Sequence, residues 1–188
     1  MIFGRTYTIK KDADLVALIS EGDNRAFREL LNRHQNAVYG FALRLLNGDT
    51  QEAEDVAQET FLRLFRVSGN YHPSASLKTF LFRIARNLCI DFFRKKRPDM
   101  LGELPDTPEK DTPLDLLEKA IDTDRLEKSI RKLPVNQRTA LLLRHNEQMN
   151  YNQISEVMNL SISAVESLLV RARQKLRLEL LKNKQEFH

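Results

Sequence analysis

Residues 83–97, with the sequence RIARNLCIDFFRKKR, place six cationic side chains, one Asn and two adjacent Phe residues within fifteen positions. Cationic side chains hold phosphate groups, and exposed aromatic rings stack on unpaired bases. At 100° per residue, one side of a helix here is apolar and the opposite side forms a cationic row. The row consists of Arg83, Asn87 and Arg94, with Arg86 and Arg97 beside it. This pattern predicts binding of single-stranded nucleic acid.

Two Phe residues, Phe82 and Phe93, fall at the border between the apolar side of this helix and its cationic row. They are candidates for stacking on bases. They are equally candidates for completing the hydrophobic core against a neighbouring helix. The same two alternatives apply to Tyr71 and His72 in the preceding loop.

A second candidate for nucleic-acid binding is YNQISEVMNLSISAVESLLVRARQKL, residues 151–176. Its apolar spacing fits a helix-turn-helix, with Asn159 at a turn position that requires a left-handed backbone. The positions expected to face a major groove are Ser163, Glu166, Ser167, Val170, Arg171 and Gln174. The positions expected near phosphates are Asn150, Asn152, Gln153, Arg173, Lys175 and Arg177. The plainer alternative is a helical hairpin with a basic surface.

A third surface lies on a helix over residues 51–66, and unlike the two basic surfaces it combines acidic side chains with an exposed Leu. Its outer face consists of Asp55, Gln58, Glu59, Leu62 and Arg66. An exposed Leu among acidic and amide side chains favours protein docking, since acidic groups repel nucleic acid. Asp55 and Glu59 also have the i, i+4 spacing of a metal-binding pair, but no His or third carboxylate converges on them. We therefore expect no metal site.

The chain shows no pattern typical of an enzyme. No nucleophile with an adjacent base and no acidic cluster is evident, so we expect no catalytic residue and no cofactor. Cys89 is the only cysteine, and the four His residues share no spacing. The segment MIFGRTYTIKK lacks the apolar core of a signal peptide, and no apolar run is long enough to span a bilayer. We expect a cytoplasmic protein.

The elements that must position these side chains are helices. Leu, Arg, Glu, Lys, Gln and Ala dominate the composition, which predicts an all-α protein. In the first half we expect helices over residues 14–20, 24–47, 51–66 and 77–97, the second capped by Asp23, the third by Asp49 and the fourth by Ser76 or a neighbour. In the second half we expect helices over residues 116–132, 135–145, 151–158 and 162–181.

Four of the six prolines fall in RPDMLGELPDTPEKDTP, residues 97–113, which predicts a linker. The net charge is +5 over residues 1–98, −7 over 99–124 and +6 over 125–188. We therefore expect a first domain over residues 1–97, an acidic linker over 98–114 and a second domain over 115–188. Two basic domains on an acidic tether predict two contacts with one polyanion.

The chain resembles the extracytoplasmic-function group of bacterial sigma factors in four stretches that occur in the same order. They are DLVALISEGDNRAFRELL, EDVAQETFLRLFR, TFLFRIARNLCIDFFRKKR and LPVNQRTALLLRHNEQMNYNQISEVMNLSISAVESLLVRARQKL. The resemblance implies that residues 1–97 are sigma region 2, a helical bundle, and that 115–188 are sigma region 4, with no folded region 3 between them. It also implies a function as an alternative sigma factor in transcription initiation.

The family resemblance implies partners as well. The helix matching Asp55–Arg66 would dock on the clamp helices of the RNA polymerase β′ subunit. Loop 67–76 and the following helix would bind the −10 element of promoter DNA and hold its non-template strand open. Region 4 would read the −35 element and contact the β flap, the acidic linker would thread towards the RNA exit path, and an anti-sigma factor would regulate the protein.

One departure from the family pattern concerns the recognition helix. The common run GTVKSRL is SAVESLL here, so Glu166 and Leu168 replace basic residues. We expect Glu166 either to accept a hydrogen bond from a cytosine amino group or to orient Arg171. The main alternative to the whole assignment is an autonomous helix-turn-helix regulator that binds promoter DNA without polymerase.

Overall fold

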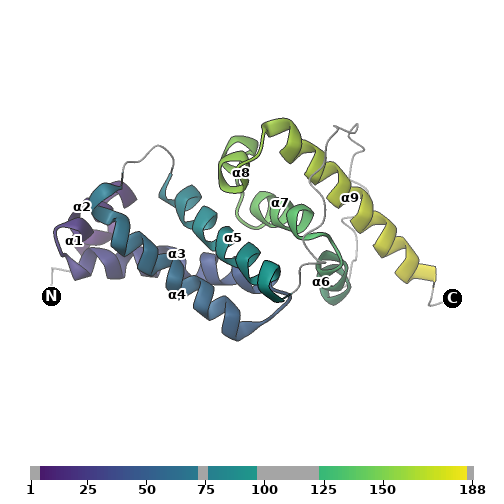
Figure 1. The fold of residues 1–188 in the computed structure, drawn as a ribbon, viewed down its shortest axis with the longest axis horizontal. Coiled ribbons are helices and arrows are strands. Elements are labelled where there is room, and N and C mark those ends of the chain that lie inside the picture. Colours follow the sequence, from purple (N-terminus) through teal and green to yellow (C-terminus); the bar gives the residue numbers. More distant parts are fainter. Residues whose placement is uncertain (1–4, 72–75, 97–122, 186–188) are drawn as a thin grey trace. The chain divides into compact units, whose positions relative to one another are not determined.

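The computed structural model describes residues 5–71, 76–96 and 123–185, and every element in those ranges is helical (Figure 1). The prediction of an all-α protein is therefore confirmed. The chain divides into two compact units, Met1–Cys89 and Ile90–His188, each described here by itself. The predicted acidic linker, with His72, Arg97 and residues 116–122, lies outside the described residues, so the predicted domain boundaries stay predictions.

The first unit contains α1 (Arg5–Thr8), α2 (Asp12–Ser20), α3 (Asn24–Leu45), α4 (Thr50–Val67), the short 3₁₀-helix η1 (Ser68–Asn70) and most of α5 (Leu77–Lys96). The predicted caps are present. The Asp23 carboxylate accepts hydrogen bonds from the backbone N–H groups of Arg25 and Ala26, and Asp49 accepts one from Glu52. The Ser76 hydroxyl accepts one from the N–H of Thr79 at 3.1 Å and so caps α5.

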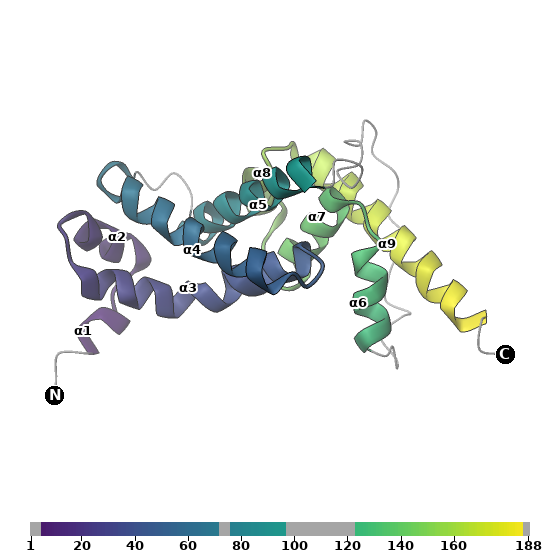
Figure 2. The same ribbon diagram turned by 60° about the horizontal axis from the view of Figure 1, so that its bottom comes forward.

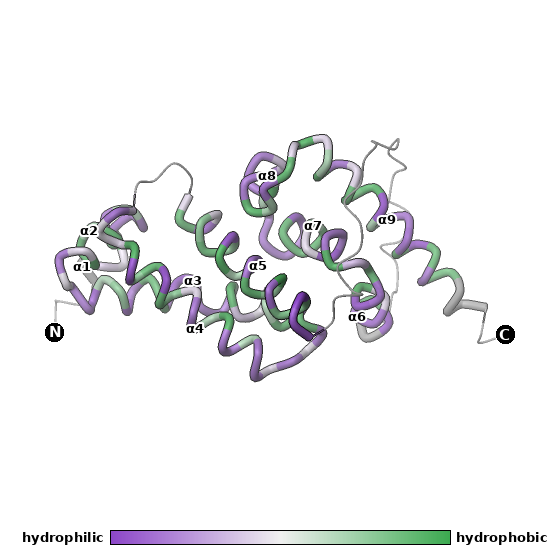
Figure 3. Tube along the Cα trace, in the orientation of Figure 1, coloured by the Kyte–Doolittle hydropathy of each residue, from purple (hydrophilic) through white to green (hydrophobic). Residues whose placement is uncertain are grey.

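Amphipathic helices build the core of this unit. Hydrophilic and hydrophobic stretches alternate along α3, α4 and α5 (Figure 3), and their apolar sides are buried against one another. The Phe41 ring of α3 meets the Phe82 ring of α5 edge to face, with centroids 5.2 Å apart. Leu30, Leu45 and Leu64 have no exposed surface. This packing fixes which sides of α4 and α5 remain accessible.

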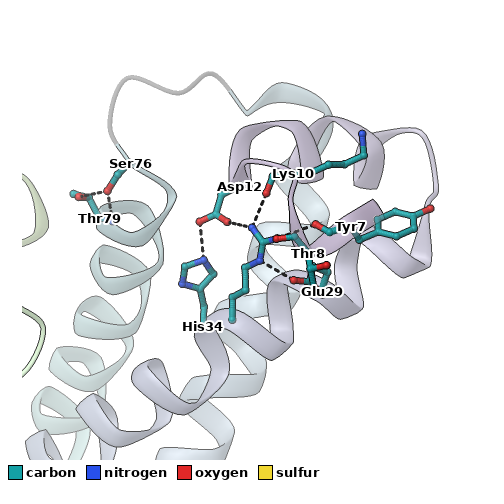
Figure 4. A network of polar contacts seen from close by, with 9 residues as sticks. Tyr7, Thr8, Lys10, Asp12, Glu29, His34, Ser76 and Thr79 are labelled. Atoms are coloured by element: carbon teal, nitrogen blue, oxygen red, sulfur yellow. Dashed lines mark hydrogen bonds and ion pairs between the residues drawn. The ribbon is translucent and has the colours of Figure 1, made fainter. Parts of the chain in front are cut away.

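The N-terminal helices are tied to α3 by Arg33, whose guanidinium makes five hydrogen bonds. It donates to the carboxylates of Glu29 and Asp12, at 2.8 and 2.9 Å. It also donates to backbone carbonyls of residues 7, 8 and 10. The other Asp12 oxygen lies 2.7 Å from Nε2 of His34 (Figure 4). Figure 2 shows α1 and α2 beside the N-terminal half of α3, as this clamp requires.

The second unit contains α6 (Thr123–Arg131), α7 (Val135–His145), α8 (Tyr151–Met158) and α9 (Ile162–Gln185). Helices α8 and α9 form the predicted helix-turn-helix, and α9 continues four residues beyond the expected end. Asn159 adopts φ 53° and ψ 52°, the left-handed conformation expected at the turn. The Ser161 hydroxyl then accepts a hydrogen bond from the Ala164 N–H at 3.2 Å and caps α9.

Candidate nucleic-acid interface and docking face

An aromatic pair and a cation meet where η1 leads towards α5. The rings of Tyr71 and Phe80 pack edge to face with centroids 5.2 Å apart. The Arg83 guanidinium carbon lies 5.5 Å from the Phe80 centroid, in cation–π range. Both rings are half-buried and Arg83 is exposed. We call these three residues the aromatic platform, because they offer ring surface and positive charge side by side.

The environment of Tyr71 supports this description. Burial raises the pKa of its phenol, and the negative charge of Asp12 raises it further. The hydroxyl is therefore protonated at neutral pH and available as a hydrogen-bond donor. Tyr71 thus combines a partly exposed ring with a polar group at its edge.

Phe80 was not among the predicted site residues. On a helical wheel Phe80 falls within the apolar side of α5, a position that by itself indicates burial in the core. The structure leaves it half-buried because it lies in the first turn of α5, next to Tyr71. The available sequence signal was the i, i+3 spacing of Phe80 and Arg83, which places an aromatic ring under a guanidinium.

Two predicted base-stacking residues are buried. Phe82 has no exposed surface and contacts Phe41, while Phe93 is 1% exposed with its ring edge to face on Phe92. Stacking on a base requires an accessible ring face. For both residues the structure favours the core alternative over base contact, and the proposed site below omits them.

The cationic row of α5 is accessible. Arg83, Asn87 and Arg94 are exposed, while Arg86 is half-buried and donates a hydrogen bond to Oδ1 of Asn87 at 3.2 Å. Arg94 pairs with Asp91 at 3.8 Å, and its side chain is 69% exposed, so solvent screens this ion pair. Arg97, also predicted for this row, lies outside the described residues. The row therefore runs along α5 from the aromatic platform towards the end of the helix.

Helix α4 presents the predicted docking face. Asp55, Gln58 and Arg66 are exposed, and Leu62 is 47% exposed. Glu59 is half-buried and pairs with Arg63 at 2.8 Å and Arg66 at 3.3 Å. The hydrogen bond from Arg63 is the main cause that lowers the Glu59 pKa.

The docking face also includes Phe65, although a helical wheel places this residue on the apolar side of α4. It is 44% exposed, and its ring meets Phe27 of α3 edge to face at 5.5 Å. Phe65 is therefore accessible, although its position on the helical wheel indicates burial. Leu62 and Phe65 together make a larger apolar patch than the sequence indicated.

The helix-turn-helix surface divides into accessible and buried positions. Ser163 and Glu166 are exposed, and Arg171 and Arg173 are half-buried. Gln153 is half-buried and belongs to a capping box, in which it exchanges hydrogen bonds with Asn150. These positions agree with the predicted distribution of polar groups around the turn.

Two predicted groove contacts are not accessible. Ser167 is 2% exposed and donates its hydroxyl to the Ser163 carbonyl at 3.0 Å, and Val170 is 5% exposed. In this structure the side chains of Ser167 and Val170 are therefore not accessible to the major groove of DNA.

Within the described ranges, His, Cys, Asp and Glu side chains do not gather in groups of three that could hold a metal ion. Asp55 and Glu59 therefore remain a pair on the docking face. In the same ranges, no helix is both long and apolar enough to cross a bilayer.

Family models match both halves of the chain. Residues 30–98 match the model described as Sigma-70 region 2, and residues 123–176 match Sigma-70, region 4. The first match covers α4, the aromatic platform and the cationic row. The second covers the helix-turn-helix.

Relatives align over nearly the whole chain. The RNA polymerase sigma-H factor of Pseudomonas aeruginosa is 35% identical over 89% of this chain and 92% of its own length. The ECF RNA polymerase sigma-E factor of Haemophilus influenzae is 31% identical, and the alignment covers 87% of this chain and 92% of that factor. The solved structure of CnrH in complex with the cytosolic domain of CnrY matches with a TM-score of 0.68 and 27% identity, over 92% of this chain and 97% of that chain.

Proposed function

We propose residue roles on the premise that this chain belongs to the sigma-70 family of RNA polymerase sigma factors, in its extracytoplasmic-function (ECF) group. As an alternative sigma factor it binds core RNA polymerase and directs promoter-specific initiation. The first unit acts as region 2 on the −10 element, and the second acts as region 4 on the −35 element. The site of action is the cytoplasm.

The aromatic platform is the observation that carries this assignment for region 2. Opening a duplex exposes bases that have lost their stacking partners, and extruding a base costs a few kcal/mol. Tyr71 and Phe80 supply replacement ring surface, worth about 1–3 kcal/mol per stacked base. Arg83 supplies a cation beside them. The proposed −10 set is the platform with Arg86, Asn87, Arg94 and Arg97.

The cationic row holds the backbone of the opened strand. Because Arg83 and Arg94 lie on the same side of α5, about 16 Å apart along the helix axis, they can contact phosphates of one strand that are separated by intervening nucleotides. Strand opening then draws on binding energy alone. We therefore propose that the protein catalyses no reaction itself and needs no cofactor.

The docking face of α4 binds the β′ clamp helices of core polymerase. Its apolar centre is formed by Leu62 and Phe65, and its rim by Asp55, Gln58, Glu59 and Arg66. An apolar centre with a charged rim is the usual anatomy of a protein interface. The acidic side chains also keep DNA away from this side of region 2.

Region 4 reads the −35 element through the first turns of α9 and contacts the β flap. We propose that Ser163, Glu166 and Arg171 contact bases and that Gln153 and Arg173 contact the backbone, and the exposure of Ser163 and Glu166 supports this assignment. We further propose that the acidic linker follows the RNA exit path and that an anti-sigma factor regulates the protein. The likeness to CnrH, which was solved with the cytosolic domain of CnrY, supports a regulatory protein partner.

Reconstitution with core RNA polymerase tests the proposal. The purified chain should confer run-off transcription from its own promoter, and it should bind the free promoter duplex weakly. An autonomous regulator would bind the duplex tightly and leave transcription by core polymerase unchanged. That second result would overturn the assignment.

A further inference from the structure

The start of α2 is held by a carboxylate that binds two side chains of α3. Asp12 is the first residue of α2, and it lies outside residues 30–98, which match the Sigma-70 region 2 model. Its Oδ1 accepts a hydrogen bond from Nη1 of Arg33 at 2.9 Å, and its Oδ2 lies 2.7 Å from Nε2 of His34 (Figure 4). Both carboxylate oxygens therefore fasten the start of α2 to the middle of α3.

Helix α2 in turn packs against the segment that carries the aromatic platform. Its apolar residues Leu15, Val16 and Ile19 are buried, and α2 contacts both α3 and η1. Tyr71 directly follows η1, and its backbone N–H donates a hydrogen bond to the Ser68 carbonyl at 3.3 Å. The Ser68 hydroxyl donates at 2.8 Å to a carbonyl in the last turn of α4. The position of Tyr71 therefore depends on how η1 lies against α2 and α4.

Tyr71 connects this support to the rest of the platform, because its ring packs on Phe80 with centroids 5.2 Å apart. Burial raises the pKa of the Tyr71 phenol, and the negative charge of Asp12 raises it further. Asp12 is thus near enough for its charge to act on the Tyr71 side chain. A continuous series of contacts leads from α3 through Asp12, α2 and η1 to the rings of Tyr71 and Phe80.

We propose that Asp12 is a positioning residue for strand opening. By anchoring α2 to α3, Asp12 holds η1 in place and so keeps the Tyr71 ring where it can stack on an unpaired base of the −10 element. The inference rests on the proposed function, in which region 2 opens that element. It extends the opening machinery to α2, a helix that contacts no DNA in the proposed function.

The size of the effect follows from how steeply stacking depends on distance. Loss of one whole base stack should lower the open population by about tenfold. A gap of about 0.5–1 Å removes roughly a quarter to a half of the dispersion energy between two surfaces. We expect a displacement of that size at Tyr71 when α2 loses its anchor. Asp12→Ala should therefore lower the open population by about threefold, which is half of the tenfold effect on a free-energy scale.

Strand opening by the holoenzyme measures this effect, with a fluorescent base analogue in the −10 element as the reporter. Core polymerase binding is measured in parallel and should be unchanged in Asp12→Ala, because α2 is not part of the docking face on α4. Asp14→Ala is the matched control. Asp14 carries the same charge in the same first turn of α2 and is exposed, so this variant should open the promoter as the wild type does.

A second substitution, Tyr71→Leu, distinguishes positioning of the ring from a general loss of stability. If Asp12 acts by placing the Tyr71 ring, Asp12→Ala should cause no further loss of opening in a chain that already lacks this ring. A general loss of stability would instead lower opening by the same factor with and without the ring. The double-mutant cycle therefore measures the coupling between Asp12 and Tyr71 directly.

The outcomes separate this inference from the proposed function. The inference is overturned if Asp12→Ala opens the promoter normally, if weaker core binding accounts for its whole defect, or if the threefold loss persists beside Tyr71→Leu. Each of these results leaves the sigma-factor assignment intact. A wild-type holoenzyme that opens no promoter overturns the proposed function itself. Circular dichroism establishes that each variant is folded. Asp12→Asn, which keeps the side-chain shape and one acceptor oxygen, replaces Asp12→Ala in the same cycle if the latter does not fold.

Discussion

Replacing Arg33 by Met would remove the clamp that fastens the N-terminal helices to α3. The change keeps an unbranched apolar stem and deletes five hydrogen bonds, to Glu29, Asp12 and three backbone carbonyls. Two carboxylates and three carbonyls would lose a donor. Because four of these five partners come from α1, α2 and the segment between them, and only Glu29 lies on α3 itself, the substitution should loosen that whole N-terminal part.

The size of the effect follows from the exposure of the groups. A hydrogen bond to a charged group contributes about 1.5–3 kcal/mol when it is shielded from water. The Arg33 and Asp12 side chains are 24% and 29% exposed, so solvent takes over part of the lost interactions. Contributions within one network are also not additive. We expect a loss of about 3 kcal/mol in the free energy of unfolding of the first unit.

Chemical denaturation of the full chain, followed by circular dichroism, measures this loss. Hydrogen exchange assigns it to a region, and amides of α2 should lose protection before those of α4. Arg28→Met is the matched control, since Arg28 is exposed on the same helix, and it should change stability by less than about 0.5 kcal/mol. If Arg33→Met is as mild as Arg28→Met, the clamp does not stabilise the fold as argued.

Three further predictions address pH, docking and promoter choice. The Asp12 pKa is lowered, chiefly by its hydrogen bond with His34 and also by Arg33. Above about pH 4 the wild type should thus be more stable than Asp12→Asn, because the Asp12 carboxylate is ionised in both the folded and the unfolded chain. Urea titrations at lower pH should show this advantage vanish as the pH falls through the lowered pKa of Asp12 in the folded state. The double change Leu62→Ala and Phe65→Ala should weaken core-polymerase binding in pull-down titrations by at least about tenfold, whereas Ile9→Ala, at an 83% exposed site, should not. Glu166→Lys should alter the preferred −35 sequence in a selection from randomised duplexes, and an unchanged preference would remove Glu166 from the readout.

Local signals in the sequence predicted much of this fold. Helix caps at Asp23, Asp49 and Ser76, and the left-handed turn at Asn159, depend on residues within three or four positions of one another. For the same reason, the helix-turn-helix follows from its apolar spacing. The Arg33 clamp could not be predicted from local signals, because its partners Asp12 and residues 7–10 are 21–26 positions away in the chain.

Depth of burial was harder to predict than the direction of a side chain. A helical wheel gives the angle at which Phe80, Phe82 and Phe65 leave their helices, but not whether a neighbouring helix reaches them. Phe82 packs against Phe41 of α3 and has no exposed surface, while Phe65 remains 44% exposed beside Phe27, and Phe80 lies in the first turn of α5. The wheel therefore indicated the cationic row of α5 and missed the aromatic ring beside it.

The most direct test of the aromatic platform is strand opening by the reconstituted holoenzyme. A fluorescent base analogue in the −10 element reports the open population, and core binding is measured in parallel. Phe80→Leu should bind core polymerase as the wild type does and reduce the open population by about tenfold, consistent with one lost base stack, while Phe80→Tyr should retain it. Normal opening by Phe80→Leu would contradict the claim that Tyr71, Phe80 and Arg83 hold the melted strand.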